Sequence, residues 1–300
     1  MLNSVYKRFI EFFFYGNVFI SLCTTGLLLQ TYVLLGVKIQ FDSIAFLVFF
    51  STLFIYSLHR LFAYRRIPVD QRGPITSWAA RNYFSLFMMV IVGGGGAIIM
   101  SFHLTQTEFF ALLLPGIISF LYEFPLIRHN KQFKRIRNFW LLKVFLITAV
   151  WGFTTVALPA IEAGLSLVDW KVWLLVLNRS LFILPLALCF DARDILFDKA
   201  EGLNTIPIKI GLEKMPRLYV QLIAAFVIVS MLQFGFLPAF RPGVLLALIA
   251  SAFITYRMVI KTIPRKSDLY YTFGIDGMMI LQFLLVWLFN LIVPFTYVWF

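Results

Sequence analysis

Three closely spaced aspartates are the strongest candidates for chemistry in this sequence. Asp191, Asp194 and Asp198 are separated by three and four residues, so on one continuous helix they would share a face. Carboxylates held this close repel each other unless a cation intervenes, and Mg²⁺ commonly joins such oxygen ligands to substrate phosphates. The same spacing is typical of a solvated helix end, with Arg193 and Lys199 as ion-pair partners. The spacing alone leaves both interpretations open.

Two cations inside apolar stretches are further candidates. Arg179 lies about nine residues into an apolar run, where a charge costs at least ~2.5–3.5 kcal/mol on insertion scales. We expect Arg179 to face a cavity rather than lipid, in a binding or a structural role. Lys143 lies near the start of another run, where it can extend to the membrane interface or contact an anionic ligand.

The composition is that of a membrane protein. Of the 300 residues, 61% are apolar and 13% are charged, against roughly 45–50% and 25% in a typical soluble domain. The net charge of +12 would suit nucleic acid if the cations gathered on a hydrated surface, but they lie between apolar runs. We therefore predict a protein of the lipid bilayer with no nucleic-acid partner.

Nine apolar runs are long enough to be membrane-spanning helices of about 20 residues each. The first run, from Phe9 to about Leu35, is too long for a cleavable signal segment and is predicted as a retained span. The sequence thus predicts an all-α, polytopic membrane helical bundle of about nine transmembrane helices, forming one domain over residues 1–300. The approximate ranges are 9–35, 41–63, 82–102, 108–127, 139–159, 170–190, 217–238, 243–261 and 271–298.

Lysine and arginine are distributed unevenly between the two sets of loops. Twenty-one lie in loops on the side of the N-terminus and three on the other side, and short loops rich in these cations stay in the cytoplasm. We predict a cytoplasmic N-terminus and an active site on that side. The predicted location of the protein is the plasma (inner) membrane of a bacterium. The three longest polar connections, 64–81, 128–138 and 191–216, fall on the same side.

Small residues inside the apolar runs have a structural interpretation. Cys23 and Cys189 both lie in such runs, where a thiol usually behaves as a small buried apolar group, so we predict no disulfide. Four consecutive glycines, Gly93 to Gly96, lie inside the third predicted span. Close helix packing is favoured over a phosphate-binding loop.

The segment that begins with the aspartates resembles the second aspartate-rich motif of the UbiA-type intramembrane prenyltransferases. In that family a D-x-x-D-x-x-x-D run is followed by a small-residue turn, a Thr-x-Pro or similar step, and a glycine. About 20 contiguous residues fit this pattern, and nine helices with the N-terminus inside is the family's architecture. The matching positions are Asp191, Asp194, Asp198, Gly202, Thr205, Pro207 and Gly211.

Two further segments are similar to the family, so the resemblance extends over nearly the whole chain. Tyr122 and Arg128 occupy the place where the family carries a tyrosine and a basic residue after the fourth helix. The stretch from Lys143 to Pro159 resembles its fifth helix. The resemblance implies that Tyr122, Arg128 and Lys143 contribute to substrate binding.

The family's first aspartate-rich motif is missing. At the end of the second predicted span, Ser57, Arg60 and Tyr64 occupy the acidic positions. His59, Arg60 and Arg65 are candidates to contact a diphosphate directly instead, since arginine pairs bidentately with phosphate oxygens. The alternative is that these arginines only anchor a helix end on the cation-rich side.

The resemblance implies an enzyme, a prenyltransferase that belongs to the transferases of alkyl groups other than methyl. Asp191, Asp194 and Asp198 would hold Mg²⁺ against the diphosphate of a polyprenyl diphosphate donor, while an unidentified acceptor attacks C1. The missing motif keeps open a non-catalytic isoprenoid- or lipid-binding membrane protein on the same scaffold. A CDP-alcohol phosphotransferase requires a D-G-x-x-A-R run that the sequence lacks at Asp191, and no internal repeat supports a transporter.

Overall fold

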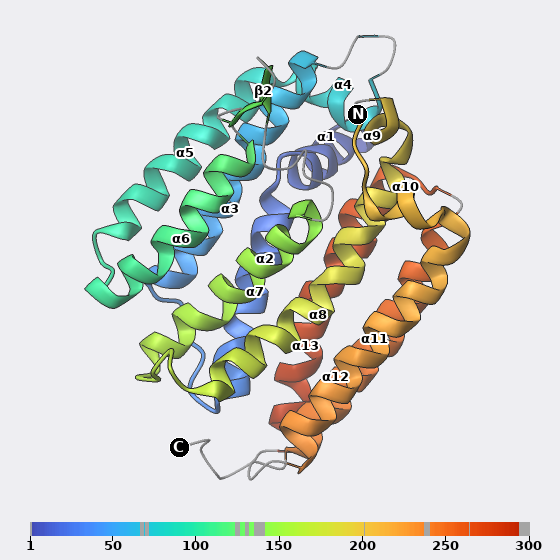
Figure 1. Ribbon diagram of the computed structural model, residues 1–300. Coiled ribbons are helices and arrows are strands. Elements are labelled where there is room, and N and C mark those ends of the chain that lie inside the picture. Colours follow the sequence, from blue (N-terminus) through green and yellow to red (C-terminus); the bar gives the residue numbers. More distant parts are fainter. Residues whose placement is uncertain are drawn as a thin grey trace.

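The computed structural model is a bundle of long helices that run alongside one another in alternating directions (Figure 1). It describes residues 2–66, 69, 72–123, 127–129, 132–134, 142–200, 202–236, 241–263 and 265–293. Eight of the described segments are helices long and apolar enough to cross a membrane. A shorter apolar helix spans Gln106–Ser119. The chain is a multi-pass integral membrane protein with the predicted helical bundle.

The helices of the bundle correspond to the nine predicted runs in order. Their bounds are α2 (Val18–Leu35), α3 (Ser43–Arg66), α5 (Tyr83–Ser101), α6 (Gln106–Glu123), α7 (Leu142–Glu162), α8 (Trp170–Arg193), α11 (Met215–Met231), α12 (Pro242–Val259) and α13 (Asp276–Ile292).

Helix α2 is the centre of the bundle. Fourteen of its 18 residues are buried, and it packs against α3, α7 and α13. Such a helix is apolar on every side, as expected for a span enclosed by other helices. The remaining helices pack in neighbouring pairs around it, with α3 against α5, α8 against α7 and α11, and α12 against α13.

The short elements gather mainly at the end of the bundle that carries α1, named here the N-terminal end (Figure 1). The described parts of the three long polar connections contribute most of them, as the sequence predicts. The elements are α1 (Leu2–Tyr15), α4 (Pro74–Arg81), the antiparallel strands β1 (Ile127–His129) and β2 (Gln132–Lys134), α9 (Ile195–Ala200), α10 (Ile206–Ile210), and the single turns η3 (Leu212–Lys214), η5 (Ile260–Thr262) and η6 (Tyr270–Ile275). A further turn, η4 (Leu232–Phe236), extends α11 at the opposite end.

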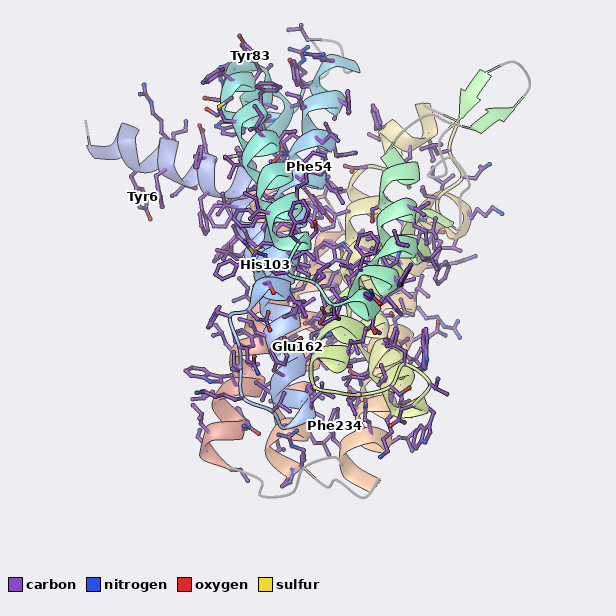
Figure 2. All side chains as sticks on the ribbon, turned by 90° about the vertical axis from the view of Figure 1, so that its left-hand side faces the viewer. Tyr6, Phe54, Tyr83, His103, Glu162 and Phe234 are labelled. Carbon is purple, nitrogen blue, oxygen red and sulfur yellow. The ribbon has the colours of Figure 1, made fainter. Side chains whose placement is uncertain are left out.

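The first predicted span is wrong in its extent. The run from Phe9 to Leu35 is not one helix, because the chain turns between α1 and α2 at Gly16 and Asn17. Asn17 has a left-handed backbone with φ of 67°, a conformation in which asparagine is enriched, and its side chain donates to the Ser57 hydroxyl at 3.1 Å. The span therefore begins at Val18, and α1 leaves the bundle sideways (Figure 2).

The predicted role of the glycine run in helix packing is confirmed. A Cβ atom on Gly93 would lie 2.7 Å from the backbone nitrogen of Phe54 in α3, closer than atoms can approach. The absence of a side chain lets α5 approach the backbone of α3 directly.

Candidate active site

The aspartates of the predicted metal site lie at the N-terminal end of the bundle, where α8 meets α9. Asp191 is in the last turn of α8, and Asp194 ends that helix with its N–H donating to the Phe190 carbonyl at 3.0 Å. The N–H of Asp198 donates in turn to the Asp194 carbonyl at 2.9 Å. Asp191 and Asp198 are 4% and 3% exposed. A fully solvated helix end is therefore excluded for these two carboxylates.

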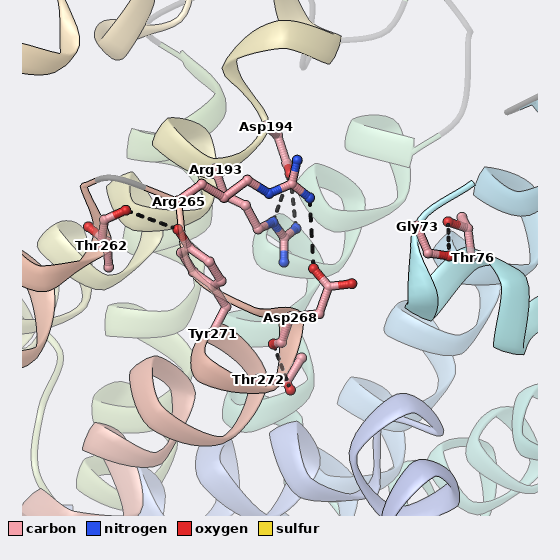
Figure 3. Close-up of polar contacts among 9 residues, drawn as sticks. All are labelled: Gly73, Thr76, Arg193, Asp194, Thr262, Arg265, Asp268, Tyr271 and Thr272. Carbon is pink, nitrogen blue, oxygen red and sulfur yellow. Dashed lines mark hydrogen bonds and ion pairs between the residues drawn. The ribbon is translucent and has the colours of Figure 1, made fainter. Parts of the chain in front are cut away.

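Arg193 is held beside the aspartates by its neighbour in the sequence. Its Nε and Nη2 atoms donate to the two carboxylate oxygens of Asp194 at 2.7 and 2.9 Å, as Figure 3 shows. The guanidinium also lies over the rings of Phe190 and Tyr271, 5.0 and 5.3 Å from their centroids. The predicted ion pair of Arg193 is confirmed, and its guanidinium also makes cation–π contacts with rings from α8 and η6.

The three aspartates do not share one continuous helical face, because α8 ends at Arg193 and α9 begins at Ile195. Within the described residues, no group of three or more histidine, cysteine or acidic side chains is close enough together to hold a metal ion. Mg²⁺ is commonly bound by one or two carboxylates, several waters and substrate phosphates. The buried Asp191 and Asp198, with Asp194 beside them, fit that smaller requirement, so the magnesium site stays a prediction.

Arg60 approaches the same region from α3. Its Nη1 atom donates to the backbone carbonyl of Tyr15 at the end of α1, and its charge is close enough to interact with those of Arg193, Asp268 and Asp276. Two guanidinium groups, one from α3 and one from α8, thus lie in one electrostatic neighbourhood. The binding role of Arg60 and its role as a helix-end anchor both stay predictions.

Two carboxylates that face the arginines come from the segment leading into α13. Asp276 begins α13 and interacts with both Arg60 and Arg193. Asp268 lies 3.9 Å from Arg265 and near Arg193 (Figure 3). Neither Asp276 nor Asp268 is among the site residues predicted from the sequence. The available signal for Asp268 was that it is a single acidic residue next to Arg265 and Lys266 in a loop.

The phenol of Tyr15 belongs to the same neighbourhood from the side of α1. Burial, with the carboxylates of Asp268 and Glu11, raises the pKa of the Tyr15 hydroxyl above its ordinary value, and the charge of Arg60 opposes this shift. Its ring packs edge-on against Trp78 of α4, with centroids 6.1 Å apart. Tyr15 is therefore a neutral hydrogen-bonding group at physiological pH.

The other predicted residues of α3 are arranged differently. Arg65 is exposed and donates to the hydroxyl of Tyr64 at 3.3 Å, so its position does not support contact with a buried diphosphate. His59 is half-buried. Arg60 is in electrostatic range of Arg193.

Three predicted binding residues have side chains that lie outside the described residues. Their backbones place Tyr122 in the last turns of α6, Arg128 in β1 and Lys143 at the start of α7. Each of these elements reaches the N-terminal end of the bundle (Figure 1). Their roles in substrate binding stay predictions.

Arg179 lies about 18 Å along α8 from Asp191, the nearest of the aspartates, since the 12 residue steps between them rise about 1.5 Å each. It is 2% exposed, which confirms that it does not face lipid. Its guanidinium donates to Gln30 Oε1 at 2.6 Å and to the Thr31 hydroxyl at 3.1 Å. The Gln30 Nε2 atom donates in turn to Gln282 Oε1 at 3.2 Å. These bonds tie α8 to α2 and α13, so the structure assigns Arg179 to a buried network apart from the site.

Solved structures share this arrangement of helices over nearly their full length. A UbiA homologue from Archaeoglobus fulgidus bound to GPP and Mg²⁺ matches with a TM-score of 0.62 at 15% identity, covering 92% of this chain and 99% of the homologue. The chain has the UbiA fold. A structure of an A. fulgidus UbiA homologue bound to DMAPP and Mg²⁺ gives 0.56 at 14% identity, with coverages of 92% and 95%.

A third solved structure is described as that of digeranylgeranylglyceryl phosphate synthase in membranes. It matches with a TM-score of 0.56 at 14% identity and covers 94% of this chain and 98% of its own. No protein-family model and no curated protein sequence matches the chain. The predicted resemblance is thus confirmed by the fold, and the chemistry has to be argued from the residues.

Proposed function

We propose that this protein is an intramembrane prenyltransferase that transfers a prenyl group from a polyprenyl diphosphate to an acceptor in the membrane. One observation carries the proposal. At one end of a UbiA fold, the aspartate-rich end of α8 lies beside two guanidinium groups, those of Arg60 and Arg193. Solved structures of the same fold are described as bound to GPP or DMAPP with Mg²⁺, which is the ligand chemistry that this charge pattern suits.

The proposed reaction breaks the C1–O bond of the donor and forms a bond between C1 and the acceptor. The electron pair of the broken bond leaves with the diphosphate, and the acceptor loses a proton. Arg60 and Arg193 stabilise the growing negative charge, because guanidinium groups form charge-assisted hydrogen bonds to phosphate oxygens. Bound Mg²⁺, held by Asp191, Asp194 and Asp198, would supply further neutralisation of the leaving group.

The location of the site supports a cytoplasmic side. The described parts of the cation-rich connections lie at the N-terminal end of the bundle together with the aspartates (Figure 1). Positive loops of this kind remain inside, so the active site would open toward the cytoplasm. The plasma (inner) membrane of a bacterium is the proposed location.

Diphosphate release tests the catalytic assignment. Protein purified into nanodiscs would be incubated with Mg²⁺, a series of prenyl diphosphates and candidate acceptors. We expect release by wild type and a loss of at least about 100-fold in Asp191→Asn and Asp194→Asn. Asp169→Asn is the control, because Asp169 caps the opposite end of α8 and asparagine caps a helix equally well. Release by wild type that is unchanged in both site variants would contradict the assignment.

A non-catalytic isoprenoid- or lipid-binding protein is the second candidate. It is favoured by α3, which brings Arg60 and the buried Ser57 to positions where the resemblance would place acids. Titration calorimetry with a non-hydrolysable thio-diphosphate analogue separates the two functions. Analogue binding by a wild-type protein that releases no diphosphate with any tested pair of substrates would support this second function.

A further inference from the structure

Helix α1 has two chemically different sides. Its residues from Tyr6 to Tyr15 read YKRFIEFFFY, and at 100° per residue the aromatic side chains at positions 6, 9 and 13 share one face. Lys7, Arg8 and Glu11 occupy the other face. Tyr6 and Phe9 are 68% and 63% exposed, so much of this aromatic surface is covered by no other part of the described chain.

The orientation of α1 is set by its junction with the bundle. Phe14 packs on Phe19 of α2 and on Phe273 of η6, with ring centroids 4.8 and 5.5 Å apart. Phe13 also contacts Phe19, at 5.8 Å. Figure 2 shows α1 projecting sideways from the bundle, with Tyr6 directed toward the end where Phe234 lies. The aromatic face of α1 is thus directed toward the side occupied by the spanning helices.

We propose that α1 is a surface helix that binds an anionic lipid bilayer, with its aromatic face among the acyl chains and Lys7 and Arg8 at the headgroups. Three observations select this partner. Helix α1 leads directly into the span α2, so the membrane surface lies at its C-terminal end. Its exposed apolar side chains are aromatic, as in helices that lie in the interface. Its exposed cations, Lys7 and Arg8, complement phosphatidylglycerol headgroups.

This contact would extend to the candidate active site through the last residue of α1. The carbonyl of Tyr15 accepts a hydrogen bond from Arg60. A bilayer that holds α1 in place therefore also holds the acceptor that positions this guanidinium. The proposal concerns a lipid contact, and it stands whether or not the prenyltransferase assignment is correct.

Hydrogen exchange followed by mass spectrometry tests the contact. The full-length protein would be compared in nanodiscs of phosphatidylcholine alone and in nanodiscs containing phosphatidylglycerol. We expect amide exchange in α1 to slow on the order of tenfold in the anionic nanodiscs, since each cation near such a surface contributes about fivefold in binding. Exchange in α2 should be the same in both lipids and serves as the measure of intact folding.

A charge-matched pair of variants makes the test specific. The double variant Lys7→Gln/Arg8→Gln should lose most of the slowing in α1. Lys261→Gln/Lys266→Gln removes two exposed cations after α12 and should keep it. Equal exchange of α1 in both lipids would overturn the proposal. Protection of α1 that instead depends on protein concentration in detergent would also overturn it, because it would identify a second copy of the chain as the partner.

Discussion

At the residue scale, the candidate site has an arginine on α3 where the family resemblance would place carboxylates. The sequence has no carboxylate at the end of α3. The structure shows Arg60 there, in electrostatic range of Asp268 and Asp276. The pairing of Arg193 with Asp194 was predictable, because the two are adjacent in the sequence. The meeting of α3, α8 and α13 was not, because it depends on contacts between helices that are more than 60 residues apart. Local spacing carries no information about such contacts.

Replacing Arg60 should weaken binding of the donor's diphosphate. We expect Arg60→Gln to lower the affinity for a thio-diphosphate analogue about 10- to 100-fold, the value of a hydrogen bond to a charged group. Arg65→Gln is the matched control on the same helix, and it should change affinity less than about twofold because Arg65 is exposed. Titration calorimetry measures the affinity of both variants. Equal losses of affinity would contradict a specific contact between Arg60 and the diphosphate.

The buried network around Arg179 should be sensitive to loss of its acceptor. Gln30→Leu removes the oxygen that accepts a hydrogen bond from Arg179 Nη1 at 2.6 Å. The buried guanidinium then lacks this acceptor. We expect a loss of about 1.5–3 kcal/mol in the free energy of unfolding, seen as a lower midpoint of thermal unfolding in detergent. Gln40→Leu is the same change at an exposed position and should leave the midpoint nearly unchanged.

At the element scale, apolar runs predict the spans well because lipid requires each span to satisfy its own backbone. The same reasoning misplaces the start of the first span. Phe9 to Leu35 is apolar almost throughout, so composition cannot separate a helix lying on a surface from one crossing the membrane. The separation depends on the left-handed turn at Asn17 and on the packing of Phe14 against Phe273. Neither is visible as a change in hydropathy.

The contact of α5 with α3 should depend on one glycine of the run and not on another. In Gly93→Ala the new Cβ would meet the Phe54 backbone, and the helices would have to separate at a cost of about 1–3 kcal/mol. Gly95 has no atom within 4 Å of such a Cβ, so Gly95→Ala should be neutral or stabilise the helix by up to about 1 kcal/mol. Thermal unfolding of the two variants compares them. Equal destabilisation would show that helix flexibility, and not the close contact, is what the glycines provide.

At the scale of the whole molecule, the bundle has two chemically different ends. The aspartates, Arg60 and α1 lie at one end, while Arg241 lies at the other. There, burial lowers the pKa of Arg241 from its ordinary value, and its guanidinium donates to the Leu34 carbonyl and to Asn290 Oδ1, both at 2.7 Å. Arg241 is therefore engaged in holding helices together, whereas Lys199 and Lys209 at the N-terminal end are exposed. The loop cations also distinguish the two ends, with 21 on the N-terminal side and three on the other.

Cysteine labelling in intact cells tests the resulting orientation. The two native cysteines, Cys23 and Cys189, are buried, so background reaction with a maleimide should be low. Lys199→Cys places a thiol at the exposed N-terminal end, and Val168→Cys places one at the opposite end, where Val168 is 90% exposed. If the positive loops are cytoplasmic, a membrane-impermeant maleimide should label Val168→Cys in intact cells and Lys199→Cys only after permeabilisation. The reverse pattern would place the aspartates outside the cell and would contradict both the orientation and a cytoplasmic source of the prenyl donor.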